Sequence, residues 1–182
     1  MIAVTGATGA LGGRVATRLA ASGVPLRLVV RDASRAPRLP GAEVRQNPGG
    51  YADGPGLRAA LAGADTVYLV SAGEAEDRVQ QHLTAVEAAA AAGVQRTVYT
   101  SFVGAHRPDP TFTLVRHHRA TEEAIRATGL RATFLRSNMY ADFVPFFATP
   151  EGDGAVIAAP AGQGATGFVS RDDLADAAVA VL

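Results

Sequence analysis

Three glycines near the N-terminus have the spacing of a phosphate-binding turn. Gly6, Gly9 and Gly12 follow the short apolar run of residues 2–5 and lead into a stretch with helical periodicity. A glycine turn at a strand end lets the backbone approach a pyrophosphate, whose charge lies at the positive N-terminus of the next helix. The alternative is a structural turn without a ligand. We favour a dinucleotide loop and expect it to use these residues: Gly6, Thr8, Gly9, Ala10, Leu11 and Gly12.

Two arginines follow the next apolar run, residues 26–30. In a dinucleotide fold the residue that ends the second strand meets the adenosine ribose, where an acid favours NAD and an arginine favours the 2′-phosphate of NADP. Arg31 occupies that position, and Arg35 lies one helical turn further on. We therefore expect NADP(H) rather than NAD(H). The alternative is that both arginines are solvated and pair with Asp32 or Glu43.

Small and polar residues follow the next two predicted strands. Ser71, Ala72 and Gly73 come after the strand expected to end at residue 70, and Ser101 follows the strand expected over residues 97–100. Ligands of open parallel sheets bind at the carboxyl ends of the strands. We expect these four residues to contact the cofactor; turn or helix-cap chemistry is the alternative.

Side chains that can move protons or orient a substrate occur in the second half of the chain. His118 can touch the nicotinamide ribose or supply a proton, and the alternative is that it bonds to Glu122, four residues on, or to a loop carbonyl. Those two side chains lack a third metal ligand, so we expect no metal. Asn138 can hold the carboxamide and Tyr140 can stack on or donate to the substrate, with loop bracing as the alternative.

The missing residue types exclude several classes of protein. The 182 residues contain no lysine, so all 17 basic residues are arginines, and they balance 17 acidic residues. Without lysine there is no Schiff base, no Walker-type phosphate lysine and no tyrosine–lysine reductase pair. Without cysteine there is no disulfide framework, thiolate nucleophile or zinc ribbon. The balanced charge gives no basic field for nucleic acid.

Short apolar runs alternate with longer helical patterns, which is typical of βαβ units. We expect an α/β fold, a Rossmann-type doubly wound parallel sheet in three α/β/α layers. The predicted strands are residues 2–5, 26–30, 43–46, 66–70, 97–100 and 132–135; the predicted helices lie near residues 11–22, 57–61, 83–92, 117–128 and 170–182.

The domain organisation follows from the same pattern. We expect residues 1–182 to form a single NAD(P)-binding Rossmann domain, with an irregular substrate-side segment at about 138–168. Because the sequence stops within an apolar helix, we expect a C-terminal substrate portion to be truncated. No apolar run reaches the length of a membrane span and no basic leader precedes the first strand, so we expect a cytoplasmic protein without membrane or nucleic-acid partners. Assembly into a homo-oligomer is left open.

The sequence resembles the NmrA-like group of atypical short-chain dehydrogenases, and within it the type 2 NADPH-dependent quinone oxidoreductases. The predicted C-terminal helix begins with a capping box at Ser170. The similarity to this family spans essentially the whole chain. It rests on the glycine loop and on the segments 30–32, 44–46, 99–101, 118–122, 135–140 and 170–173. One departure stands out: the family usually has Asp-Tyr-x-Asp where this chain has Gly50-Tyr51-Ala52-Asp53, so we expect the adenine contact to be weaker or to move to a backbone group.

The resemblance implies an NAD(P)H-dependent oxidoreductase without the usual proton donor. Leu114 and His118 occupy the positions of the tyrosine and lysine of ordinary short-chain dehydrogenases. A quinone accepts hydride without a strong positioned acid, so orientation against the nicotinamide can supply much of the rate. The aromatic residues of segment 143–147 suit a flat quinone ring, or equally pack as core. We favour an NADPH:quinone reductase; the alternative is a non-catalytic, redox-sensing regulator that binds NADP(H).

Overall fold

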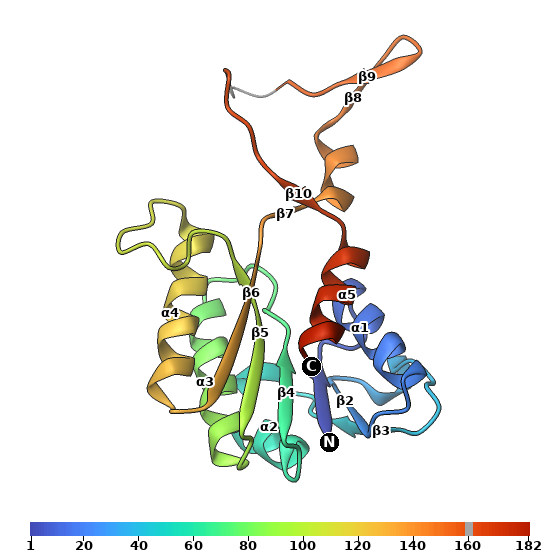
Figure 1. Cartoon of the computed structure of the whole chain (residues 1–182), viewed down its shortest axis with the longest axis vertical. Helices are drawn as coiled ribbons and strands as arrows, with labels where there is room; N and C mark the ends of the chain where they lie inside the picture. Colours follow the sequence, from blue (N-terminus) through green and yellow to red (C-terminus); the bar gives the residue numbers. More distant parts are fainter. Residues whose placement is uncertain (159–161) are drawn as a thin grey trace.

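The computed structural model describes residues 1–158 and 162–182 and contains a parallel six-stranded sheet. Its strands run in the order β3-β2-β1-β4-β5-β6 (Figure 1), which is that of a doubly wound dinucleotide fold. The predicted fold class is confirmed. The chain reverses direction across the sheet between β1 and β4, and ligands bind at such a switch point. The strands are β1 (Ile2–Thr5), β2 (Leu26–Val30), β3 (Ala42–Gln46), β4 (Thr66–Leu69), β5 (Arg96–Phe102) and β6 (Arg131–Ser137).

Helices cover both faces of the sheet (Figure 1). On one face, strand residues such as Ala3 and Tyr99 pack in one apolar core with α2, α3 and α4. On the other face, their neighbours Val4 and Val98 pack with α1 and α5. Burial on both faces explains why the strands are continuous apolar runs. The helices are α1 (Ala10–Ala21), α2 (Gly54–Leu61), α3 (Arg78–Ala91), α4 (Thr113–Ala127) and α5 (Arg171–Val181).

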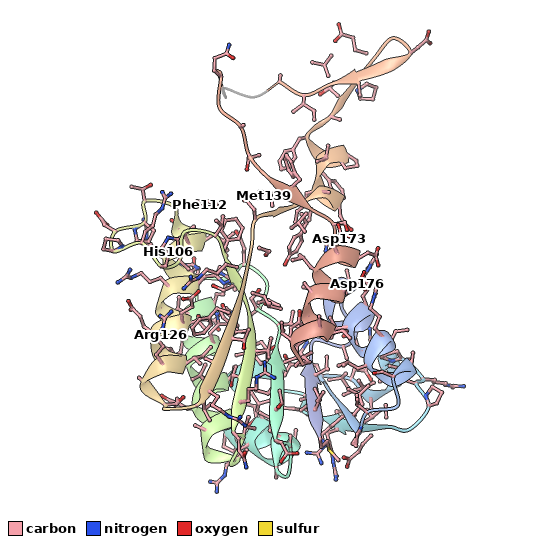
Figure 2. The ribbon with its side chains drawn as sticks, viewed as in Figure 1. His106, Phe112, Arg126, Met139, Asp173 and Asp176 are labelled. Carbon is pink, nitrogen blue, oxygen red and sulfur yellow. The ribbon has the colours of Figure 1, made fainter. Side chains whose placement is uncertain are left out.

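The last helix is tied to the first by charge as well as by apolar contacts. Arg18 bonds to Asp172 at 2.9 Å and to Asp176 at 2.6 Å, and Figure 2 shows Asp176 on the flank of α5. Ser170 caps α5 by accepting a hydrogen bond from the Asp173 amide at 3.0 Å, as predicted. The C-terminal helix therefore returns to the core and packs beside α1.

Between β6 and α5 the chain leaves the sheet at its carboxyl edge, near Met139 (Figure 2). Strand β7 (Met139–Tyr140) pairs with β10 (Phe168–Val169), and the helical turn η3 (Ala141–Phe147) leads to a hairpin of β8 (Thr149–Glu151) and β9 (Gly154–Val156). This arm projects away from the sheet (Figure 1). It corresponds to the predicted irregular segment, of which residues 159–161 lie outside the described residues.

Several boundaries differ from the prediction. Helices α2 and α3 begin at Gly54 and Arg78, earlier than the predicted residues 57 and 83. Helix α4 begins at Thr113 rather than near residue 117, because its N-cap is Phe112, which offers no side-chain cap and therefore no sequence signal. Strands β5 and β6 are both longer than predicted, since their polar ends still pair along the ladder. In the part of the chain that the structure describes, no helix is long and apolar enough to cross a membrane.

Candidate functional site

The glycine loop has the geometry that close approach of a phosphate requires. Gly6 has a φ of +63°, and its carbonyl accepts a hydrogen bond from the Gly9 amide at 2.9 Å. Gly9 is the N-cap of α1, and no side chain caps this helix. A Cβ on Gly12 would lie 2.3 Å from the Gly6 carbonyl oxygen. The loop thus offers free amides at a helix N-terminus, a fit for a pyrophosphate.

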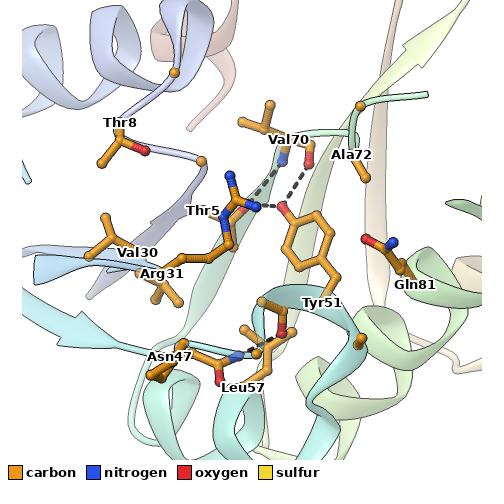
Figure 3. Close-up of a pocket in the computed structure, with 18 of the residues that line it drawn as sticks. Thr5, Thr8, Val30, Arg31, Asn47, Tyr51, Leu57, Val70, Ala72 and Gln81 are labelled. Atoms are coloured by element: carbon orange, nitrogen blue, oxygen red, sulfur yellow. Dashed lines mark hydrogen bonds between the residues drawn. The ribbon is translucent and has the colours of Figure 1, made fainter. Parts of the chain in front are cut away.

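A cavity of about 490 Å³ opens at the carboxyl edge of the sheet, beside this loop (Figure 3). It spans the switch point between β1 and β4 and extends toward the end of β2. The residues predicted to bind cofactor that line it are Gly6, Thr8, Gly9, Arg31, Ser71, Ala72 and Gly73. The lining residues that sequence reasoning did not single out for binding include Asn47, Pro48, Gly49, Tyr51 and Gln81.

Arg31 reaches over this cavity (Figure 3). Its side chain passes close to Gly50, where an added Cβ would lie 3.2 Å from the Arg31 Cδ. The carboxylates named as alternative partners are occupied elsewhere: Asp32 caps the turn η1 (Ala33–Arg35), and Glu43 binds Arg27 at 2.8 Å. Arg31 forms no ion pair with either acid in the part of the chain that the structure describes. Its side chain is exposed, as that alternative expected, and it lies at the edge of the cavity.

Tyr51 closes the floor of the cavity. It belongs to the helical turn η2 (Gly50–Ala52), and its hydroxyl donates to the Val70 carbonyl at 2.6 Å and lies 2.5 Å from the Thr5 Oγ1 (Figure 3). Burial raises the pKa of Tyr51, so it stays a neutral donor. Beside it, Asn47 ties this loop together through a 2.7 Å bond from its Nδ2 to the Gly50 carbonyl.

We expect Tyr51→Phe to lower the free energy of unfolding by about 1 kcal/mol, the usual net value of one intramolecular hydrogen bond. The ring is retained and the Val70 carbonyl loses its donor. Urea denaturation followed by circular dichroism measures the change, with Tyr140→Phe as the control because no hydrogen bond of its hydroxyl is found in the described structure. Equal free energies of unfolding in both variants would show that the Tyr51 hydroxyl does not contribute to stability.

Six residues predicted to bind cofactor do not line the cavity. Leu11 is buried in the core, Ala10 and Gly12 lie within the first turn of α1, and Arg35 is exposed on η1. Ser101 is buried and donates to Glu122 at 2.6 Å. Asn138 uses its side chain on Thr166 and on the next backbone amide, which is loop bracing.

Tyr140, predicted to meet the substrate, lies at the base of the arm. Its ring stacks on Phe143 with centroids 5.8 Å apart. The Arg171 guanidinium lies 4.7 Å from the ring centroid and pairs with Asp142 at 3.0 Å. These contacts connect the arm to the start of α5. The tyrosine is not among the residues that line the cavity.

His118 lies in a buried polar cluster between α3, α4 and β5. Its Nδ1 is 2.8 Å from the Tyr99 hydroxyl, and its Nε2 is 3.1 Å from Nη2 of Arg78. Because a guanidinium can only donate, Nε2 accepts and the proton sits on Nδ1. Burial and the Arg78 charge lower the pKa of His118 to about 3. This low pKa favours a neutral imidazole at neutral pH, with each ring nitrogen in contact with a protein group.

Glu122 does not bond to His118, which corrects that alternative. It is fully buried and binds Arg136 at 2.6 Å, Arg126 at 2.8 Å and the Ser101 hydroxyl. These partners hold the pKa of Glu122 below its usual value despite its burial. The carboxylate thus joins α4 to β5 and β6. No group of three or more His, Asp or Glu side chains that could hold a metal is found within the described residues.

Comparison with known proteins agrees with this geometry. The model of the NAD(P)H-binding family matches residues 6–182. The chain belongs to this family. Relatives include (4-alkanoyl-5-oxo-2,5-dihydrofuran-3-yl)methyl phosphate reductase of Streptomyces griseus, 37% identical over 100% of this chain and 63% of the relative. Quinone oxidoreductase 2 of Escherichia coli is 32% identical over 100% and 64%. The resemblance to NmrA-like proteins and quinone oxidoreductases is thereby confirmed.

A solved structure extends the comparison to a bound ligand. Citrobacter sp. triphenylmethane reductase complexed with NADP(H) superposes with a TM-score of 0.86 and 34% identity, over 100% of this chain and 65% of that one. The chain spans 63–65% of the length of these relatives.

Proposed function

We propose that the cavity binds NADPH and that the protein is an NADPH-dependent oxidoreductase. The observation that carries this proposal is the uncapped glycine loop at the start of α1 together with Arg31 at the same cavity. The loop amides would hold the pyrophosphate, and Arg31 would bind the 2′-phosphate in a bidentate manner. We propose that residues 1–182 form a single NAD(P)-binding domain.

The proposed reaction is hydride transfer to a quinone or a similar conjugated acceptor. Bound NADPH would supply the hydride, and the chain would supply binding and orientation. Leu114 and the neutral His118 stand where a tyrosine–lysine pair would otherwise donate a proton. An acceptor whose anion is stabilised by conjugation fits such a site, because it needs no strong acid. Two relatives are named as a reductase and a quinone oxidoreductase, which supports an enzymatic function rather than a redox-sensing one.

The acceptor would lie beyond the carboxyl edge of the sheet, where the arm leaves it. Phe143 stacks on Tyr140, and Phe146 is 81% exposed. Flat apolar rings of this kind suit a planar acceptor. His118 and Tyr140 are proposed to shape this side of the site rather than to transfer protons.

The decisive experiment mixes the protein with NADPH and a small benzoquinone and follows absorbance of the reduced nicotinamide. Acceptor-dependent oxidation supports the reductase. Tight binding of NADPH without turnover would support the redox sensor instead. Absence of any dinucleotide binding would contradict both.

Arg31→Ala should remove the preference for NADPH over NADH. Loss of a charge-assisted bond of about 1.5–3 kcal/mol corresponds to a drop of roughly 10- to 150-fold in NADPH affinity, with NADH affinity little changed. Titration of the two reduced cofactors by nicotinamide fluorescence measures the ratio. Arg35→Ala is the matched control, since Arg35 does not line the cavity. An unchanged ratio in Arg31→Ala would rule out this phosphate contact.

A further inference from the structure

The segment that follows β4 is fixed by side chains from outside its own strand. The Val70 carbonyl accepts from Tyr51, and the Ser71 amide donates to the Thr100 Oγ1 at 2.7 Å. Both contacts hold the peptide group between residues 70 and 71. Residues 71–73 line the cavity, so the orientation of their backbone decides which polar groups a ligand meets.

The next two peptide groups are held by α3. The Ala72 amide donates to the Nε2 of His82 at 2.8 Å, and the Ala72 carbonyl accepts from the Nε of Arg78 at 2.9 Å. Arg78 and His82 lie four residues apart and therefore share one face of the helix. Both are buried, with exposed fractions of 2% and 0%. Together they clamp both backbone hydrogen-bonding groups of Ala72.

A second layer of contacts orients the clamp. Because the Ala72 amide donates to Nε2, the proton of His82 sits on Nδ1, which lies 2.9 Å from the Thr121 Oγ1. Thr121 in turn donates to the His117 carbonyl at 2.9 Å. Arg78 is oriented by the Nε2 of His118, which accepts from it at 3.1 Å. Helix α4 thus sets the rotamers through which α3 holds the loop.

Arg78 is an unusual residue to bury. It forms no salt bridge with a carboxylate in the part of the chain that the structure describes, and its Nη1 has no hydrogen-bond partner there. A buried charge without an ionic partner costs several kcal/mol. A protein tolerates such a cost when the buried charge contributes to function. Arg78 contacts the cavity lining through its hydrogen bond to the Ala72 carbonyl.

We propose that Arg78 and His82 are positioning residues that present the Ser71 carbonyl and the Gly73 amide to the bound dinucleotide. These two groups are the backbone acceptor and donor that the clamp leaves without a partner among the described residues. A ligand edge with a donor beside an acceptor matches them: the amino edge of adenine or the carboxamide of nicotinamide. The inference rests on the proposed binding of NADPH at this cavity.

The test compares two replacements of the same histidine. His82→Gln keeps an acceptor near the position of Nε2, whereas His82→Leu keeps bulk without an acceptor. We expect NADPH affinity, measured by nicotinamide fluorescence, to fall about tenfold in His82→Leu, as for one lost hydrogen bond. In His82→Gln it should stay within about threefold. Affinity in His82→Leu equal to that of the original protein, or equal loss in both variants, would overturn the clamp.

Two fragments of NADPH show which half of the cofactor contacts the Ser71 carbonyl and the Gly73 amide. Weaker binding of 2′,5′-ADP alone in His82→Leu assigns the contact to adenine, and weaker binding of reduced nicotinamide mononucleotide alone assigns it to the carboxamide. Loss with both fragments or with neither contradicts a single recognised edge. Should His82→Leu not fold, hydrogen exchange of the Ala72 amide in the unaltered protein decides: fast exchange overturns the clamp. Failure of the unaltered protein to bind NADPH would instead overturn the proposed function.

Discussion

Gly12→Ala should lower NADPH affinity by about a hundredfold, because a displacement of the loop by about 1 Å is enough to misplace bound groups. The new Cβ would lie 2.3 Å from the Gly6 carbonyl oxygen and 3.0 Å from that of Thr5. Both contacts are with backbone, which cannot rotate away as a side chain can. Overpacking of this kind also lowers the free energy of unfolding by about 1–3 kcal/mol.

Gly13→Ala is the matched control on the next residue of α1. Its Cβ would lie 3.1 Å from the Ala7 carbonyl, a contact relieved by a small adjustment. Alanine also raises helix propensity by up to about 1 kcal/mol. We expect stability close to that of the original protein and NADPH affinity within about threefold. Fluorescence titration and urea denaturation of both variants measure the difference. Equal affinities would show that close packing at Gly12 does not shape the phosphate site.

The sequence predicts the sheet and the glycine loop well because their signals are local. Strands β1 and β2 have the predicted bounds, since apolar runs bounded by glycine or arginine leave little freedom. The contacts of Tyr51, by contrast, join residues that are distant in the sequence. Its hydroxyl partners Thr5 and Val70 lie 46 and 19 residues away, and only the fold brings them together.

Helix α3 shows why the clamp could not be predicted. In the sequence, Leu83, Val86, Ala89 and Ala90 have helical spacing and therefore indicate an apolar face turned toward the core. The structure buries Arg78 and His82 instead, together with Val86 and Ala89, and leaves Leu83 partly exposed. Polar residues on a core face have no apolar signal, and their partners on α4 and β5 are distant in sequence.

These two buried histidines make stability depend on pH. Burial, followed by the Arg78 charge, lowers the pKa of both His82 and His118 from 6.5 to about 3. In the unfolded chain they titrate near 6.5, so below that pH the unfolded state binds more protons than the folded state. The free energy of unfolding should therefore be flat above about pH 7.5 and fall by about 1.4 kcal/mol per pH unit for each histidine below 6.5.

For the pair, the expected loss between pH 7.5 and pH 5 is about 4 kcal/mol. Urea denaturation across this range measures it, and stopping at pH 5 keeps most of the carboxylate titrations out of the window. His82→Gln should remove about half of the slope, whereas His106→Gln, at an exposed position, should leave it unchanged. A slope that survives in His82→Gln would mean that His82 is protonated in the folded protein, and a protonated Nε2 cannot accept the Ala72 amide. The pH dependence thus tests the tautomer on which the clamp depends.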